Sequence, residues 1–417
     1  MDQPSRRRFW ERAHVRQNAQ ILVAVAVGAA TGLLVAGLHW IVLGIWAPLS
    51  HKDAWWVALL PLAGLLLSTA IVRTHRPVST ETTEEYIRVF HDASGRMDFR
   101  GAPSRILAAI ATIGLGGSMG LEGPSIYLGS LIGERAEHRF SALIGEQEGR
   151  KVLLVAGAAA GISAIFKAPV TGIIFALEVP YRDDFARHAL IPAIFSSATG
   201  YLVFVALIGT TPLFPVTAAP LRFPDLIASL VIGVGCGLCA RVFLFVFRRA
   251  VDLAARLPAA ASAAIGGVIT AGVGVAALAV FHLPLPLGPG YNGILEVTRG
   301  VITSPWLLIT LLVMKIVSTS ATASGGGVGG LFFPSVMMGA ATGAALGHVV
   351  SGPPSLFAVV GIAAFLGGVY KVPLAGVAFV AETTGAPAYI IPGLLASAVG
   401  YLLSGNESLS SHQRYRS

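Results

Sequence analysis

The chain has 417 residues, of which 54% are hydrophobic and 12% are charged, about half the charged share of a soluble globular protein. Its 29 Lys and Arg against 21 Asp and Glu leave a formal net charge of +8. This composition argues against a water-soluble fold, and the two cysteines, Cys236 and Cys239, are too few for a disulfide framework or a cysteine-rich zinc module.

Basic residues gather at the two ends of the chain. The sequence begins MDQPSRRRFWERAHVR and ends HQRYRS. Lys and Arg beside membrane spans favour the cytoplasmic side, so we expect a cytoplasmic segment at residues 1–18 and a cytoplasmic tail at 406–417. A nucleic-acid partner is not expected, because no soluble domain carries a basic face. We predict a multi-pass protein of the plasma (inner) membrane.

Six apolar stretches have the length of about 20 residues that a helix needs to cross a bilayer. They lack the alternation of barrel strands, so we expect helices at residues 21–48, 55–72, 188–209, 225–248, 260–282 and 356–382. The first stretch is too long for a signal-peptide core, and we expect it to be retained.

Three further apolar stretches are interrupted by Gly, Pro and single charges, at residues 104–132, 152–181 and 304–350. A break in a helix at membrane depth must be buried in protein or line a polar path. The polar stretch at residues 73–100 predicts a cytoplasmic loop with one short helix.

Three sequence blocks occur twice, in the same order. The pattern GLxxPSxxxGxxxG starts at Gly120 and again at Gly330; the blocks FKAPVTGIIFALE and YKVPLAGVAFVAE follow, and a third pair starts at Pro192 and Pro392. Composition alone would explain one block but not an ordered set of three. A duplicated chain with broken segments at matching positions indicates a transport protein with its site between the repeats, which we assign to residues 19–210 and 211–405.

The segments GSMGLEGPS and GVGGLFFPS are suited to hold an anion. Their glycines permit close approach of the backbone, and Pro124 and Pro334 favour the start of a helix. The first N–H groups of a helix have no partner within it and, with the helix dipole, attract anions. Two such starts meeting at the membrane midplane would stabilise an anion without a buried Lys or Arg. Helix packing through GxxxG-like faces is an alternative for the glycines, but it leaves the prolines unexplained.

Glu122 has Phe332 as its counterpart, so one half alone carries a carboxylate at this point. An ionisable group at membrane depth is costly and is usually functional. Beside helix N-termini this carboxylate can occupy the anion site as a tethered competitor, and protonation would release it. We predict that Glu122 is a gate and that permeation rises as pH falls; a simple helix cap is the alternative.

Glu178 and Glu382 recur in both halves at the ends of helices. This recurrence favours a structural role, as caps or partners of a neighbouring loop, over a proton relay. Lys167 and Lys371 begin the same segments. We keep two interpretations for these lysines, namely steering of anions from a vestibule and anchoring at the interface.

No residue pattern indicates catalysis or a cofactor. The ten histidines lack zinc-ligand spacing, and neither a nucleophile elbow nor a P-loop occurs. We expect no enzyme activity, no cofactor and no metal.

These motifs together resemble those of the CLC family of chloride channels and chloride/proton antiporters. GLEGP is similar to the family's GREGP element, GLFFP to its GxFxP element, and the two longer blocks to its paired xxAPxxGxxFxxE segments. The resemblance covers nearly the whole chain. It implies an all-α polytopic membrane protein made of two inverted repeats, with broken, tilted helices whose N-termini meet at the membrane midplane. It also implies a homodimer in the lipid bilayer in which each subunit has its own pore for chloride or a similar small anion.

The same resemblance assigns roles to residues. It makes Glu122 the gating glutamate, and it turns the backbone amides of Leu331 and Phe332 toward the central anion. The other anion-binding positions that it implies lie in the two matching motifs, at Gly120, Leu121, Gly123 and Gly330.

Several positions depart from the family pattern. Leu121 stands where the family has arginine before the gating glutamate. The element with the family's anion-binding serine has no clear counterpart in residues 78–84, where Thr80 and Thr82 are candidates for a pore-lining hydroxyl. The family's pore tyrosine aligns with Ser410, which predicts an altered inner closure.

Val179 stands where the family's exchangers carry a second glutamate that brings protons from the inside. The family's channels usually lack that acid, so we predict passive permeation gated by Glu122. The alternative is a proton-coupled anion antiporter in which another acid or a water chain replaces the relay. A membrane-embedded enzyme ranks far lower, because the apolar segments hold only isolated acids.

Overall fold

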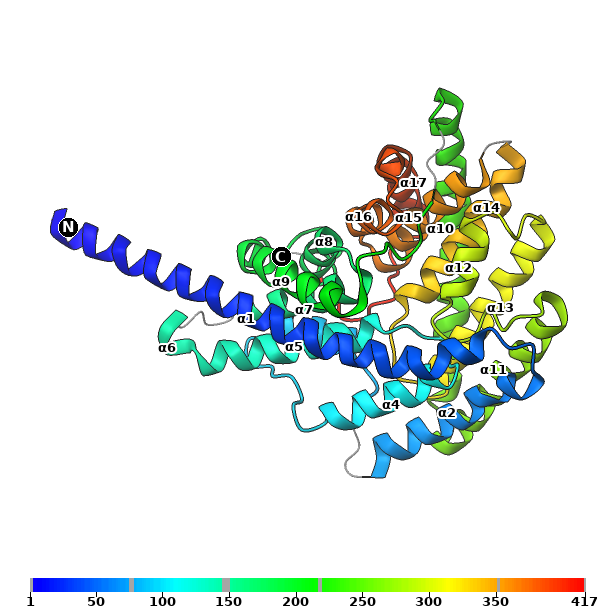
Figure 1. The fold of residues 1–417 in the computed structure, drawn as a ribbon, viewed down its shortest axis with the longest axis horizontal. Helices are drawn as coiled ribbons and strands as arrows, with labels where there is room; N and C mark the ends of the chain where they lie inside the picture. The colour runs from blue at the N-terminus through cyan, green and yellow to red at the C-terminus, as the bar shows by residue number, and fades with distance from the viewer. Residues whose placement is uncertain (1–2, 75–78, 145–150, 217–219, 351–352, 416–417) are drawn as a thin grey trace.

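The computed structural model describes residues 3–74, 79–144, 151–216, 220–350 and 353–415, and over these ranges it is helical, with two isolated bridges in place of strands (Figure 1). The helices of the first half are α1 (Gln3–Ser50), α2 (Trp55–Thr74), α3 (Thr83–His91), α4 (Ala102–Gly114), α5 (Glu122–Arg139), α6 (Ser141–Ile144), α7 (Val152–Phe166), α8 (Pro169–Glu178), the 3₁₀ turn η1 (Arg187–Ala189) and α9 (Leu190–Ile208). Those of the second half are α10 (Phe223–Ala254), α11 (Ala259–Phe281), α12 (Tyr291–Thr298), α13 (Pro305–Ser324), α14 (Phe332–Val350), α15 (Pro354–Tyr370), α16 (Pro373–Thr384), η2 (Pro387–Tyr389) and α17 (Ile390–Leu403).

Seven helices in the described ranges are long and apolar enough to cross a membrane. Five of them, α1, α2, α9, α10 and α11, coincide with the predicted spans that begin at residues 21, 55, 188, 225 and 260. The other two, α13 and α14, are the two parts of the stretch that was expected to be broken at 304–350. The predicted short helix in the polar stretch is α3.

The prediction of one continuous span at 356–382 is wrong. The chain breaks between α15 and α16 at Lys371, whose φ is 60°. Pro373 then starts α16, because a residue without an N–H group suits the first helical turn. Its counterpart in the first half is the break at Lys167, with φ of 52°, followed by Pro169 at the start of α8.

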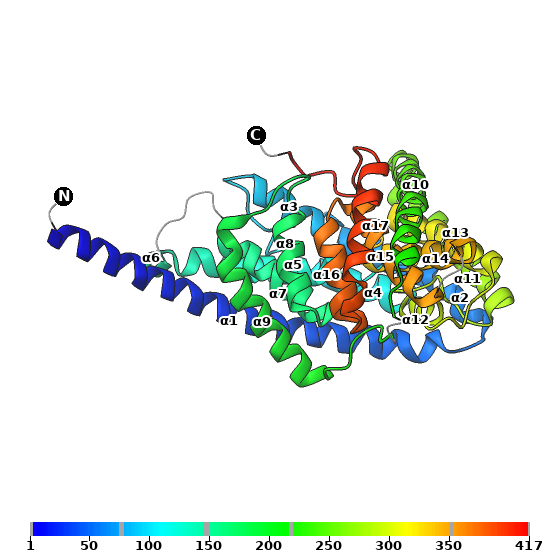
Figure 2. The same cartoon turned by 90° about the horizontal axis from the view of Figure 1, so that it is seen from above.

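The packing of the first half is repeated in the second, as the colours of Figures 1 and 2 help to follow. In the first half α7 packs against α5 and α9, and α9 packs against α1. In the second half α15 packs against α14 and α17, and α17 packs against α10. The two halves meet through α2 with α11 and through α8 with α16. The assigned boundary at 210/211 falls in the connection between α9 and α10.

Two reciprocal caps fix the relative direction of the halves. The Glu178 carboxylate, at the end of α8, accepts the N–H groups of Leu374 and Ala375 at 3.3 and 2.9 Å. The Glu382 carboxylate, near the end of α16, accepts those of Val170 and Thr171 at 2.9 and 2.7 Å. Since each helix end reaches the other helix start, α8 and α16 run antiparallel. The predicted inverted repeats are confirmed.

Glycines bring the backbones of paired helices into contact. A Cβ atom built on Gly129 or Gly157 would overlap the carbonyl oxygen of the other, so α5 and α7 touch without side chains between them. Gly339 and Gly361 form the same contact between α14 and α15. The expected packing role of the GxxxG-like glycines is therefore present beside the helix starts, as in other tightly packed membrane helices.

Candidate anion site

The two repeated motifs meet at the centre of the molecule. The Gly120 N–H donates to the Gly330 carbonyl at 2.8 Å, and the Gly330 N–H donates to the Gly120 carbonyl at 2.7 Å. This small antiparallel bridge, the first of the two isolated ones, places the start of α5 beside the start of α14. Both helices begin two residues ahead of the predicted prolines, at Glu122 and Phe332.

The Glu122 side chain lies across this junction and is 1% exposed. Its Oε1 atom accepts the backbone N–H groups of Phe332 at 2.6 Å and Phe333 at 3.3 Å, the first N–H groups of α14. Its Oε2 atom is buried and has no hydrogen-bond partner. A Cβ atom on Gly120 or Gly330 would overlap this carboxyl group, so the glycines make the room in which it lies. The carboxylate stands where the helix start would hold a free anion.

A tyrosine side chain lies at the neighbouring backbone amide, that of Leu331. The Tyr370 hydroxyl lies close to the Leu331 backbone N–H, and its ring lies 5.8 Å from that of Phe332. Leu331 and Phe332, the two amides expected to face an anion, are thus engaged by Tyr370 and Glu122. Sequence reasoning missed Tyr370, because it sought the pore tyrosine near the chain end; the signal was its match to Phe166 in the repeat.

Aromatic rings close the site on the side of α14. Phe332 packs on Phe166, Phe379 and Phe175, with ring centroids 4.6, 5.0 and 5.4 Å apart. Phe175 and Phe379 are equivalent in the two repeats. Rings of this kind exclude water around the carboxylate, which strengthens its electrostatic interactions.

The predicted pore-lining threonines lie apart. The Thr82 side chain is 4% exposed, and its hydroxyl donates to the Gly329 carbonyl at 3.4 Å. That hydroxyl is so close to Gly123 that a Cβ atom there would overlap it. Thr80 is exposed. Of the two, Thr82 is the one beside the junction, while Val78 of the same segment lies outside the described residues.

Leu121 and Val179, the two altered positions, are buried in the core. The Leu121 carbonyl accepts the N–H and hydroxyl groups of Ser125 at 3.0 and 2.8 Å. The Val179 carbonyl accepts the side-chain amide of Gln413 at 2.9 Å, and the Tyr370 carbonyl accepts the same amide at 2.8 Å. The chain end thus bridges the two halves where α8 and α15 stop.

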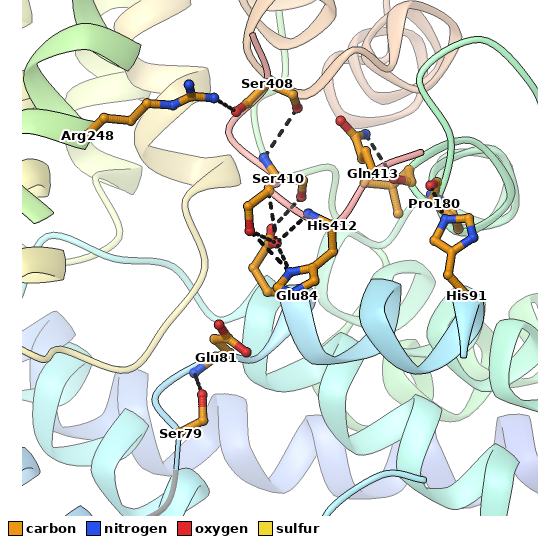
Figure 3. A network of polar contacts seen from close by, with 12 residues as sticks. Ser79, Glu81, Glu84, His91, Pro180, Arg248, Ser408, Ser410, His412 and Gln413 are labelled. Carbon is orange, nitrogen blue, oxygen red and sulfur yellow. Dashed lines mark hydrogen bonds and ion pairs between the residues drawn. The ribbon is translucent and has the colours of Figure 1, made fainter. Parts of the chain in front are cut away.

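Residues 405–415, which we call the C-terminal strap, pass beside α3 (Figure 3). Ser410 is 1% exposed and donates to Glu84 Oε1 at 2.5 Å. Glu84 Oε2 accepts the N–H and hydroxyl groups of Ser411, both at 3.1 Å, and lies 3.0 Å from His412 Nδ1. Ser410 therefore faces a carboxylate on α3, and sequence reasoning did not single out Glu84.

His412 is the titratable partner in this contact. The hydrogen bond to the Glu84 carboxylate raises the pKa of His412 above its ordinary value of 6.5. Both side chains are partly exposed, at 33% for His412 and 24% for Glu84, so water reaches the pair. The strap is held through a proton-sensitive contact.

Lys371 binds a helix end. Its ammonium group donates to the carbonyls of Tyr401 and Gly405 at 3.0 and 2.5 Å and to the Ser404 hydroxyl at 2.6 Å, all at the end of α17. Lys167 donates to the Thr211 carbonyl at 3.2 Å. These contacts fit the anchoring interpretation of the two lysines.

One buried lysine lies outside the junction of the two motifs. Lys315 of α13 is fully buried, and the expectation that the anion site works without a buried Lys or Arg stays a prediction. Its ammonium group donates to the carbonyls of Pro286 and Gly288 at 3.0 and 3.1 Å. In the sequence it was only a single charge within an apolar stretch, and nothing there shows which way it points. Over the described ranges no three His, Cys, Asp or Glu side chains gather as a metal ion would require.

Comparison with known proteins agrees with this arrangement. The chain is 29% identical to a putative chloride channel protein ClcB-like of Ralstonia nicotianae, over 84% of this chain and 82% of that protein. It is 27% identical to the H(+)/Cl(-) exchange transporter ClcA of Klebsiella pneumoniae, over 93% of this chain and 85% of that one. The fold matches a crystal structure of a CLC-type fluoride/proton antiporter, with a TM-score of 0.83, 21% identity, and 96% and 98% of the two chains covered.

A second solved structure, of a slow cyanobacterial Cl⁻/H⁺ antiporter, matches with a TM-score of 0.78 and 21% identity, over 92% of this chain and 94% of that one. The family model described as voltage gated chloride channel matches residues 63–405. That range contains both repeated motifs, Glu122 and the reciprocal caps. The chain therefore belongs to the voltage gated chloride channel family and is a CLC-type anion transport protein of the membrane.

Proposed function

We propose that this protein conducts chloride or a similar small anion passively, along a path between its two halves, with Glu122 as the gate. The observation that carries the proposal is the Glu122 carboxylate on the first N–H groups of α14. Those groups attract negative charge, and the same donors cannot serve the carboxylate and a permeating anion together. An anion binds there only after the side chain leaves.

Around the vacated position the side chains of Tyr370 and Thr82 would supply hydroxyl donors. Tyr370 already lies at the Leu331 amide, and Thr82 lies against Gly123. Hydroxyl and amide donors hold an anion without a full positive charge, so the ion is released quickly. Protonation of Glu122 removes its charge and weakens its hold on α14, so flux rises as pH falls.

The test is reconstitution into vesicles with an imposed chloride gradient. We expect chloride flux without coupled proton movement, because the residue directly after Glu178 is Val179, which cannot carry a proton. Proton movement against its own gradient, driven by chloride, would overturn the passive reading.

Proton-coupled antiport is the second candidate. It is supported by Glu84 and His412, an acid and a base on the strap side of the site, and the two matched solved structures are described as antiporters. In this case Glu84→Gln would abolish proton movement and leave anion flux. The same variant in a passive conductor changes no proton signal.

We also propose a homodimer in the plasma membrane, with residues 1–18 and 406–417 on the cytoplasmic side. Exposed apolar side chains occupy matching positions on α9 and α17, for example Ile191 with Ile391 and Ile194 with Leu394. The apolar surface formed by α9 and α17 therefore has similar side chains on both helices, which suits a self-complementary contact between two copies of the chain. Cross-linking in native membranes tests it: a cysteine at Ile194 or Leu394 should yield a linked dimer.

A further inference from the structure

A cavity of about 180 Å³ lies between the end of α1 and the start of α12. Polar residues line it, namely Ser50 at the end of α1, His51 directly after it, and Tyr291 and Asn292 at the start of α12. It is at the end of α1 remote from the basic start of that helix. Under the proposed orientation this is the outer side of the membrane.

The Asn292 side-chain amide donates to the Ser50 hydroxyl at 3.1 Å, and that hydroxyl donates to the Ala47 carbonyl at 3.0 Å, so the free donors here come from the start of α12. The first hydrogen bond of α12 runs from the Ile294 N–H to the Gly290 carbonyl, so the N–H groups of Tyr291, Asn292 and Gly293 have no partner within the helix. The Tyr291 hydroxyl is buried and has no hydrogen-bond partner. A buried hydroxyl without a partner is costly, so this one is suited to a transient ligand.

The Lys315 side-chain amine lies directly behind the wall of the cavity. Gly290 lines the cavity, and a Cβ atom on it would lie 3.2 Å from the ammonium nitrogen of Lys315. Lys315 donates to two carbonyls and belongs to none of the ion pairs among the described residues. When it is protonated, its charge is therefore not cancelled by a contacting carboxylate, and in a dry environment the field of such a charge extends far.

The same lysine is connected to the Glu122 site. The Pro286 carbonyl, which Lys315 binds, also accepts the Ser118 hydroxyl at 3.0 Å. Ser118 is two residues before Gly120 of the central bridge. On the other side, the Tyr291 ring lies 4.6 Å from that of Phe333, whose N–H donates to Glu122.

We propose that this cavity is a recruiting site for small monovalent anions, in which Lys315 supplies the attraction and the Tyr291 hydroxyl with the start of α12 supplies the donors. An anion held there is separated from Glu122 by Tyr291 and Phe333. Its negative charge also repels the Glu122 carboxylate and favours departure of that side chain. The inference rests on anion transport, and it holds for passive and for coupled transport alike.

The experiment measures initial flux in planar bilayers while chloride is varied on one side at a time. For Lys315→Met we expect the half-saturating concentration to rise about tenfold on the cavity side, with the other side unchanged and the maximal flux within about twofold. Tyr291→Phe should raise the same value about threefold, and Lys315→Arg should restore most of the wild-type value.

The matched control is Lys52→Met, which removes an exposed cation from the connection between α1 and α2 at the same end. It should leave the half-saturating concentration within about twofold, because an exposed charge is screened. An equal rise on both sides for Lys315→Met and Tyr291→Phe would overturn the proposal, since it indicates damage to the central site. If Tyr291→Phe folds and its half-saturating chloride concentration does not rise on the cavity side, the proposal is also overturned. This result decides the question if Lys315→Met does not fold.

Failure of this inference and failure of the passive proposal are distinguishable. If the wild-type protein couples proton movement to chloride, passive conduction is overturned. The one-sided change in the half-saturating chloride concentration of the variants can still be measured in that case. If the wild type conducts chloride passively but the variants show no one-sided change in half-saturating concentration, only the recruiting site is overturned.

Discussion

The first half of the chain starts α5 with a glutamate, whereas the second half starts α14 with a phenylalanine at the same point of the repeat. At other points the halves agree: Glu178 and Glu382 each cap the partner helix, and glycines bring α5 to α7 as they bring α14 to α15. Residues that match between the halves maintain the packing of the helices. The unmatched carboxylate of Glu122 lies where the starts of α5 and α14 meet. The difference shows that symmetry carries the fold here and that its breaking creates the candidate gate.

A second unmatched pair supports this view. Tyr370 corresponds to Phe166, and only the tyrosine has a hydroxyl, which lies at the Leu331 amide. Both rings pack around Phe332. The hydroxyl oxygen that only Tyr370 has is thus again beside the junction of the two motifs. The aromatic ring that Tyr370 and Phe166 share belongs to the packing that is common to both halves.

Removing the charge of the unmatched residue should have the largest effect. For Glu122→Gln we expect chloride flux at neutral pH to rise by up to about a hundredfold, because hydrogen bonds to a charged group contribute about 1.5–3 kcal/mol. The pH dependence of flux should become flat. Flux from reconstituted vesicles between pH 5 and 8 checks this. Glu178→Gln is the control, and a pH profile for Glu122→Gln like that of the wild type would contradict the gate.

Alanine at the matched glycines should destabilise both halves to a similar degree. Gly157→Ala and Gly361→Ala each place a methyl group against the backbone of the facing helix, and overpacking of this kind costs about 2 kcal/mol. Thermal unfolding in detergent measures it. Gly44→Ala, in α1 with open space around it, is the control and should be neutral or slightly stabilising. A large difference between the two halves would break the comparison.

The reciprocal caps should be nearly interchangeable. Glu178→Gln and Glu382→Gln each replace a charged acceptor of two backbone N–H groups by a neutral one, at a cost of about 1 kcal/mol. We expect similar losses in thermal stability and unchanged proton movement. A selective loss of proton coupling in Glu178→Gln would assign that residue to a relay and not to the frame.

The strap has no counterpart in the repeat, and its contact should have the smallest effect. Because the Glu84 carboxylate raises the pKa of His412, the folded protein binds this proton more tightly than the unfolded chain. The stabilisation is complete below the ordinary pKa of 6.5 and is lost as pH rises through the raised value. His412→Ala should therefore lower thermal stability slightly at pH 6 and not at pH 9. Equal losses at both pH values would exclude the ion pair as the cause.

The sequence alone predicted the features that repeat or that break a repeat. The paired motifs predicted the helix starts at Glu122 and Phe332 to within two residues, and five spans followed from hydropathy. The continuous span at 356–382 was wrong because hydropathy does not register a single left-handed residue such as Lys371. Lys315 was missed because the direction of a buried side chain depends on tertiary packing.

The choice between Thr80 and Thr82 was open for a similar reason. Two neighbouring threonines at the start of a short helix differ in burial only after the helix has docked, and Thr82 is then the buried one. Tyr370 was overlooked because alignment to the family's tyrosine led to Ser410. Repeat matching within the chain would have been the better guide.

The exchange of caps between α8 and α16 restricts how this molecule can move. Were the halves to swing apart, Val170, Thr171, Leu374 and Ala375 would each lose an acceptor in a setting where water cannot replace it. Large rocking of one half against the other is therefore energetically blocked along this seam. Under the proposed function, ions would pass a scaffold held along this seam, and the Glu122 side chain would be the part that moves.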